Sequence, residues 1–215
     1  MVESPSALPK VVQELGLSEL ELRALGDFLF NQNQAYRGLP RAGICTLNTL
    51  IKPDVVYEVR TGNEYPGAPL TVTSFLLHDI PQLGGQIVSI HYRDNLDQLR
   101  GMTDRKAGET FLRALHDDLH YLAQILKEGG LRDARMIVGL TTLSAKWGER
   151  HGFTTFLYSN DPELIRLHLA SIDGLPFQDK KKLSPLTLFL ISPTRFIKEF
   201  FIKDFSKDAL AKLGT

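Results

Sequence analysis

The chain has 215 residues, and its 25 lysine and arginine residues balance its 25 aspartate and glutamate residues. Apolar residues make up 43% and charged residues 23%, which excludes collagen-like, low-complexity and wholly disordered proteins. Zero net charge argues against bulk nucleic-acid binding, and no apolar stretch reaches the roughly 18 residues of a membrane span. The single cysteine, Cys45, excludes an internal disulfide and favours a reducing compartment.

The first predicted element is a helix near the N-terminus. Residues 1–10 contain no basic segment followed by an apolar one, so no secretory signal is expected and the protein is predicted to be cytoplasmic. From Ser18 to Gln32, leucine and phenylalanine recur at helical spacing. Ser18 and Glu21 have the spacing of a capping box, which predicts that the helix begins there.

After this helix the apolar pattern becomes typical of β-strands. Three segments are rich in β-branched and aromatic residues and are bounded by Gly, Pro or Asn, which predicts strands joined by turns. They are Asp54–Arg60, Leu70–His78 and Gln86–Tyr92. Leu96–Met102 is a fourth candidate, although Asp97 and Arg100 in its interior disfavour a strand.

The second half of the chain alternates helices and strands. The strongest helix is predicted from Asp104 to Glu128, because leucines at a 3-4-3-4 spacing form one buried stripe and two glycines end it. The later strands are predicted at Arg135–Leu140, Phe153–Tyr158 and Leu186–Ile191, and the later helices at Leu143–Arg150, Asp161–Ile172 and from Ser192-Pro193 to Phe205. This order predicts one α/β (α+β) domain over residues 1–215, with a mixed central sheet and helices on both faces.

The start of the long helix is a candidate anion site. Its segment is Arg105-Lys106-Ala107-Gly108-Glu109-Thr110. A helix N-terminus leaves N–H groups unpaired and carries a partial positive charge, Gly108 allows close approach to the backbone, and Arg105 and Lys106 add full charges. Together these features suit a phosphate or pyrophosphate. The alternative is an ordinary helix start with Thr103 or Asp104 as the N-cap.

A second segment, Thr141–Phe153, predicts a short helix that ends in His-Gly-Phe and leads directly into a strand. With the first segment and the strand between them, this run resembles the GNAT acyltransferase superfamily over about residues 86–158. Arg105-x-x-Gly108 matches the first half of the family's R/Q-x-x-G-x-G/A turn, whose backbone N–H groups hold the pyrophosphate of coenzyme A. Gly152-Phe153 matches the end of its N-x-x-A-x-x-x-Y-x-x-x-G-F run.

The resemblance implies a mostly antiparallel sheet. It also implies that the protein transfers an acyl group from acetyl-CoA or another acyl-CoA to a small-molecule or peptide amine. Residues 105–110 would hold the acyl-CoA. The amine would attack the thioester carbonyl directly while a general base removes its proton, and a backbone N–H on a splayed strand would polarise the carbonyl. His91, late in its predicted strand, is the candidate base. The alternative for His91 is a half-exposed histidine with no chemical role.

The chain departs from the family pattern at several positions. Thr110 stands where a small residue is usual, and its larger side chain leaves less space for a phosphate. In the second motif, Thr141 and Ser144 replace the usual Asn and Ala. Gly148 stands where a tyrosine commonly serves as the general acid. Either Tyr158 or ordered water replaces that acid, or the domain is a catalytically inactive binding module with the same fold.

His116 and His120 suggest a further alternative, a metal-dependent hydrolase. Two histidines four residues apart on a helix have the spacing that zinc uses, and Asp117 lies between them as Glu does in H-E-x-x-H sites, although Asp is shorter. A third ligand would come from another histidine or a carboxylate; the candidate histidines are His78, His91 and His151. The other interpretation, which leaves no metal site, places the pair at the edge of the leucine stripe.

The C-terminal region is basic and rich in phenylalanine. Residues 180–215 carry eight Lys or Arg and three Asp or Glu. Phe196, Ile197, Phe200 and Phe201 make a broad apolar helix face, which is expected to pack on the core. The alternatives are a partner, such as a second copy in a homodimer, or an anionic membrane surface without an integral span.

Overall fold

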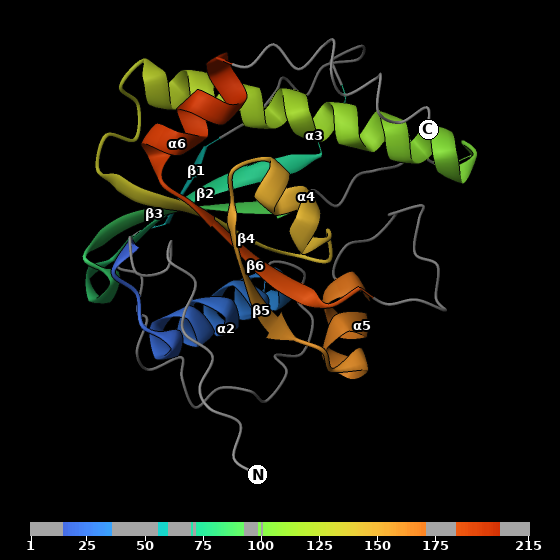
Figure 1. Cartoon of the computed structure of the whole chain (residues 1–215), viewed down its shortest axis with the longest axis horizontal. Coiled ribbons are helices and arrows are strands. Elements are labelled where there is room, and N and C mark those ends of the chain that lie inside the picture. Colours follow the sequence, from blue (N-terminus) through green and yellow to red (C-terminus); the bar gives the residue numbers. More distant parts are fainter. Residues whose placement is uncertain are drawn as a thin grey trace.

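Six strands form one open sheet in the order β1-β2-β3-β4-β6-β5 (Figure 1). The computed structural model describes residues 15–35, 56–59, 70, 72–92, 99, 101–170 and 184–202. The strands are β1 (Val56–Val59), β2 (Thr73–Ile80), β3 (Gly85–Tyr92), β4 (Ala134–Thr141), β5 (Thr154–Ser159) and β6 (Leu186–Ile191). All neighbours are antiparallel except β3 and β4, which are parallel. The prediction of a mixed, mostly antiparallel sheet is therefore confirmed.

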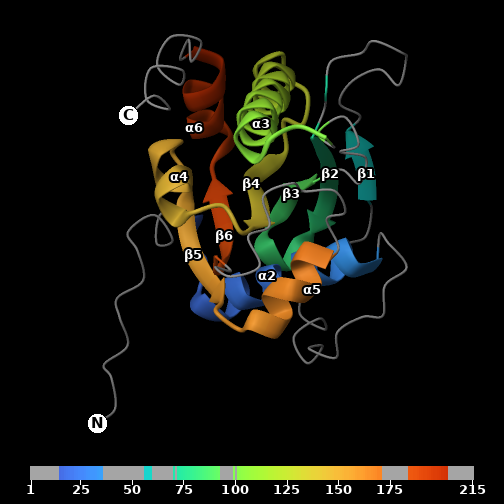
Figure 2. The ribbon, with the colours of Figure 1, turned by 90° about the vertical axis from the view of Figure 1, so that its right-hand side faces the viewer.

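Helices cover both faces of the sheet, as predicted (Figure 2). On one face lie α3 (Asp104–Lys127), α4 (Ala145–Arg150) and α6 (Pro193–Ile197), which continues into a π-helical turn at Lys198–Ile202. On the other face lie α2 (Glu19–Ala35) and α5 (Pro162–Ala170). Each face of the sheet has its own apolar core. Because side chains alternate along a strand, the core that a strand residue joins shows on which face its side chain lies. None of the described helices is both long enough and apolar enough to cross a bilayer.

The helices begin where their capping residues are. Ser18 and Glu21 form the reciprocal capping box: the Ser18 N–H donates to Glu21 Oε2 over 2.7 Å, and the Glu21 N–H donates to Ser18 Oγ over 3.3 Å. The hydroxyls of Thr103 and Ser144 likewise accept from the backbone at the starts of α3 and α4. Short-range hydrogen bonds of this kind explain why these predicted starts lie within two residues of the observed ones.

A buried carboxylate joins α3 to the start of β2. Oδ2 of Asp118 accepts from the backbone N–H groups of Val72 and Thr73 and from the Thr73 hydroxyl, each over 2.8 Å. Asp118 is 4% exposed, so these three bonds are shielded from water. They place the first residues of β2 against the middle of α3.

One predicted element differs from the structure, and others extend beyond the described residues, among them the ends of the predicted strand Asp54–Arg60 and the end of the predicted helix Asp161–Ile172. In the Leu96–Met102 segment, the described residues Leu99, Gly101 and Met102 are in turns rather than a strand, and the rest lie outside the described residues. Consecutive turns lead from there into the N-cap of α3. The predicted C-terminal helix is described only to Ile202, so its last part, including Phe205, lies outside the described residues.

Candidate functional site

The parallel strands β3 and β4 separate at their carboxyl ends. Their pairing stops at Ile90 and Gly139. Beyond this point β3 stays paired with β2 through Tyr92, and β4 stays paired with β6 through Thr141. We call these two diverging ends the strand split. In α/β sheets, ligands bind beyond the carboxyl ends of parallel strands, so the strand split is the candidate site.

A row of hydroxyl side chains crosses the sheet at the strand split, on the face covered by α3. The residues of this hydroxyl row are Thr73, Tyr92, Thr141 and Thr187. Thr73 pairs with Tyr92 across β2 and β3, and Thr141 pairs with Thr187 across β4 and β6. The three threonines are buried, whereas Tyr92 is half-buried and packs its ring against Phe111 of α3 at 5.6 Å. Polar groups therefore line one side of the split.

The two middle members of the hydroxyl row bridge the split. The Tyr92 hydroxyl lies 2.8 Å from Thr141 Oγ1, and the same Oγ1 accepts from the backbone N–H of Leu143 over 3.0 Å. Burial raises the pKa of Tyr92 to about 12, although the bond to Thr141 opposes this shift. Tyr92 is therefore a neutral phenol at physiological pH, able to donate its proton in a hydrogen bond.

A chain of buried polar groups lies on the opposite face, under α2 and α5. Ser89 Oγ lies 2.6 Å from Nε2 of His78 and 2.6 Å from Nε2 of His91. The ring of Phe28 in α2 meets His78 edge to face at 5.0 Å. Ser89 has one hydroxyl proton and three neighbours that could accept it, the two rings and the Leu76 carbonyl at 3.4 Å, so at least one ring must donate to Ser89 Oγ. This chain holds His91 in one orientation beside the strand split.

The structure thus places His91, the predicted base, at the carboxyl end of β3. Burial, together with the nearby His78 and His168, lowers the pKa of His91 to about 3. His91 is neutral at pH 7, as a base must be. With a pKa this low, however, it holds a proton weakly and can serve only as a weak base.

Acid is expected to destabilise the fold through these buried histidines. Burial lowers the pKa of His78 from 6.5 to about 4, so between these values the unfolded chain binds more protons than the folded one. The stabilisation is complete above about pH 6.5 and is lost as the pH falls towards 4, by about 3 kcal/mol for His78 alone. The melting temperature of His78→Gln, followed by circular dichroism, should therefore fall less between pH 6.5 and 4.5 than that of the wild type. Equal falls would contradict this assignment.

Tyr158, the predicted replacement acid, lies away from the strand split. It is on β5 at the edge of the sheet, and β4 and β6 separate it from β3. Its hydroxyl donates to Oδ1 of Asp27 over 2.5 Å, and its ring packs directly on Gly26 of α2. The phenol proton is therefore occupied in holding α2 against the sheet edge.

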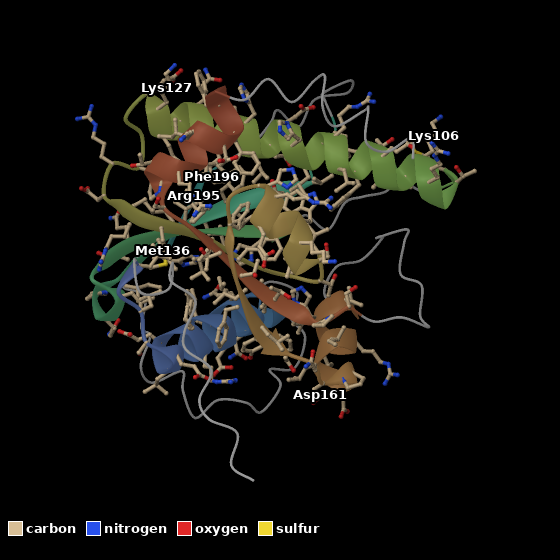
Figure 3. The ribbon with its side chains drawn as sticks, viewed as in Figure 1. Lys106, Lys127, Met136, Asp161, Arg195 and Phe196 are labelled. Carbon is tan, nitrogen blue, oxygen red and sulfur yellow. The ribbon has the colours of Figure 1, made fainter. Side chains whose placement is uncertain are left out.

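The predicted anion segment, Arg105–Thr110, lies within α3 rather than in a loop. The N–H of Ala107 donates to the Thr103 carbonyl over 2.8 Å, so the helix has already begun, and Gly108 lies in its second turn. The expected loop around Gly108 is therefore not present, because the helix itself uses these amides. Arg105 and Lys106 remain exposed in the first turn, with Arg105 paired to Glu109 at 2.9 Å and Lys106 extending from the end of α3 (Figure 3).

Gly101, in the turn that leads into α3, is a glycine with loop geometry. Its φ is 81°, it is exposed, and a Cβ placed on it would meet nothing within 4 Å. Sequence reasoning missed it because the Leu96–Met102 segment was considered as a strand. A glycine two residues before the N-cap Thr103 was the available signal.

The second predicted segment ends as expected, and the structure shows which side chain lies beside Gly148. Gly152 adopts the left-handed conformation with φ of 80°, and Phe153 is buried, as predicted. A Cβ on Gly148 would lie 2.7 Å from the ring of Phe189 in β6. The position where a tyrosine is usual is thus filled by Phe189, with Trp147 stacked beside it at 6.2 Å.

The His116–His120 pair is engaged with the C-terminal helix. The Nδ1–H of His120 donates to the Phe200 carbonyl over 2.7 Å, and the His116 ring contacts the Phe200 ring at 6.0 Å. Among the described residues, no three or more His, Cys, Asp or Glu side chains are placed to hold one metal ion. Phe196 and Phe200 are fully buried here, which confirms the expected packing of this helix on the core.

Comparison with known proteins found no matching family model, no matching curated protein and no matching solved structure.

Proposed function

We propose that this protein transfers an acyl group from an acyl-CoA to an amine, as its resemblance to the GNAT superfamily implies. The observation that carries the proposal is the strand split, where the pairing of β3 with β4 stops after Ile90 and Gly139. A polarising backbone N–H on a splayed strand is what direct aminolysis of a thioester requires. The strands on either side of the split keep their outer partners, so this geometry is held by the whole sheet.

The turn before α3 supports an anion site at the start of this helix. Gly101 has a φ of 81° and open space around its backbone, and the first N–H groups of α3 follow it. The N-cap Thr103 uses its hydroxyl to accept from the Lys106 N–H. Arg105 and Lys106 would add positive charge beside bound phosphates.

The reaction would proceed by direct attack. The amine nitrogen forms a bond to the thioester carbonyl carbon, whose oxygen accepts a hydrogen bond from the β3 backbone, and the carbon–sulfur bond breaks. The thiolate leaves with the electron pair of that bond and takes a proton from water, and the nitrogen loses its proton to water, because His91 is too weak a base to hold it. Because the pKa of His91 lies near 3, the acceptor has to reach the site already as the free amine.

Binding of coenzyme A is the first test. Free coenzyme A at about 100 times its dissociation constant should stabilise the protein by about 2.7 kcal/mol, which a thermal shift detects. Arg105→Ala should weaken binding about tenfold through the loss of a charged phosphate contact, as measured by isothermal titration calorimetry.

Arg113→Ala is the matched control, since Arg113 is also exposed on α3 but lies two turns further from its N-terminus. Equal affinity of the two variants would argue against phosphates at this helix end. The absence of any shift with coenzyme A or acetyl-CoA at millimolar concentration would rule the proposal out.

A second candidate function is a binding module without turnover. It is favoured by the Phe189 ring, which fills the position beside Gly148, and by the low basicity of His91. Binding of acetyl-CoA without thiol release, in the presence of a panel of alkylamines, amino acids and peptides, would select this alternative.

A further inference from the structure

Three histidines lie on the face of the sheet that α2 and α5 cover. His78 on β2 and His91 on β3 are joined through Ser89, and His168 comes from α5. His78 and His168 are 0% exposed, and His91 is half-buried. A protein core that contains three imidazoles on one side of a sheet is sensitive to acid on that side, because a buried imidazole resists protonation.

Two of these histidines are in direct contact with α2. The Phe28 ring meets His78 edge to face at 5.0 Å, and the Phe30 ring stacks on His168 at 6.3 Å. Nδ1 of His78 is buried and has no hydrogen-bond partner in the part of the chain that the structure describes. Both ring nitrogens of a protonated His78 would carry a proton, so the proton on Nδ1 would have no acceptor while α2 is in place.

We propose that α2 and α5 form an acid-sensitive switch: protonation of His78, His91 and His168 releases these two helices from the sheet while the α3 side stays folded. We call the two helices, Glu19–Ala35 and Pro162–Ala170, the α2 layer. They lie together on one side of the sheet, and α3, α4 and α6 lie on the other (Figure 2). The switch does not depend on the proposed acyl transfer.

Protonation is disfavoured only while the α2 layer covers the histidines. Burial lowers the pKa of His78 and of His168 from 6.5 to about 4, and burial together with the other two histidines lowers the pKa of His91 to about 3. Once the layer is released, each ring regains its ordinary pKa near 6.5. Below this pH the open form binds up to three more protons than the closed one, so opening becomes more favourable as the pH falls towards 4.

The other ionisable groups near this core do not reverse the effect. Those that the structure describes are Glu19, Glu21, Arg23 and Asp27 of α2, Asp79 of β2, Arg135 of β4, Tyr158 of β5, and Glu163 and Arg166 of α5. Of these, Asp27 alone is buried, and it accepts from the Tyr158 hydroxyl. Burial raises the pKa of Asp27, so the closed form holds this proton more tightly than the open one. Asp27 therefore opposes release by at most one proton, against the three of the histidines.

The histidines on the α3 side are more exposed. His116 and His151 are half-buried, and His120 is exposed. Burial lowers the pKa of His116, and His151 and His120 act in the same sense, but Asp117 beside it opposes the shift. We therefore expect the α3 side to tolerate a pH at which the α2 layer opens.

Hydrogen exchange of backbone amides, followed by mass spectrometry at pH 7 and pH 5 and corrected for the intrinsic effect of pH, tests the proposal. Each histidine should raise the opening constant of the α2 layer about 20-fold between these pH values, so the amides of α2 should lose about 10⁴-fold in protection. The amides of α3 should change much less. The near-ultraviolet circular dichroism of Trp147, the only tryptophan in the sequence, should persist, because its ring packs on Phe153 and Phe189 on the α3 side.

Two variants show whether the histidines are the cause. His168→Gln, which cannot take up the proton, should reduce the acid-induced loss of protection in α2 about 20-fold. His120→Gln, on the exposed side of α3, is the matched control and should leave the loss unchanged. A loss in His168→Gln as large as in the wild type would contradict the role of His168 and with it the three-histidine switch.

The wild type alone also decides the matter, even if His168→Gln does not fold. If α2 and α3 lose protection together, acid unfolds the whole domain and the proposal is wrong. It is equally wrong if the protection of α2 does not depend on pH between 7 and 5. Selective loss in α2 with Trp147 still packed supports the switch, whatever the result with coenzyme A.

Discussion

Asp118→Ala is expected to lower the free energy of unfolding by about 3–5 kcal/mol. The carboxylate accepts three hydrogen bonds from the start of β2. Its removal leaves two backbone N–H groups without their acceptor in a buried environment, in addition to the lost charge-assisted bonds. Urea unfolding followed by circular dichroism measures the change.

Asp117→Ala is the matched control, because Asp117 precedes Asp118 on the same helix and is exposed. Its effect should stay within about 0.5 kcal/mol. Asp118→Asn should lie between the two, since its side-chain oxygen can still accept. An Asp118→Ala variant as stable as Asp117→Ala would show that the carboxylate does not hold β2 to α3.

Phe200→Ala is expected to cost about 3–5 kcal/mol of stability. The Phe200 ring is fully buried and meets four other rings, at 4.6 to 6.2 Å between centroids. These rings come from α3, the turn after α4, the start of β5 and α6, so a single truncation loosens the contact between all of them. The measurement is again the free energy of unfolding in urea.

Phe201→Ala provides the comparison on the same π-helical turn. Phe201 is half-buried, with Lys127 Nζ 3.7 Å from its ring centroid and His120 stacked at 5.5 Å. Its loss should cost about 1 kcal/mol. If Phe200→Ala cost no more than Phe201→Ala, the C-terminal helix would not be part of the core.

The locations of the elements could be predicted because their causes are local. Ser18 and Glu21 cap α2 across three residues, and the leucine stripe of α3 repeats at the helical period within one element. Buried segments could also be predicted from the apolar pattern. The apolar strand at Leu186–Ile191, for example, is buried along its whole length. The error at Leu96–Met102 arose where polar residues interrupted the alternation and left no clear period.

The candidate site was predicted less well, because its geometry depends on contacts between residues that are distant in the sequence. Gly108 resembled a loop glycine because Arg105 stands three residues before it, but the cap at Thr103 had already started the helix. Gly148 could not be understood without Phe189, which is distant in sequence and packs against it only once α4 lies on β6. The bond between Tyr92 and Thr141 joins residues 49 positions apart, and no periodicity indicates it.

The amino-acid sequence by itself determined most of the helices and strands, and where most of them begin, because backbone preference and capping act over three or four residues. Only the tertiary structure decided that β3 lies parallel to β4 and parts from it after Ile90 and Gly139. It also decided that His78, Ser89 and His91 meet on one face. The physical reason is that a strand can pair with many others, and the choice among them depends on how both faces of the sheet are covered at the same time.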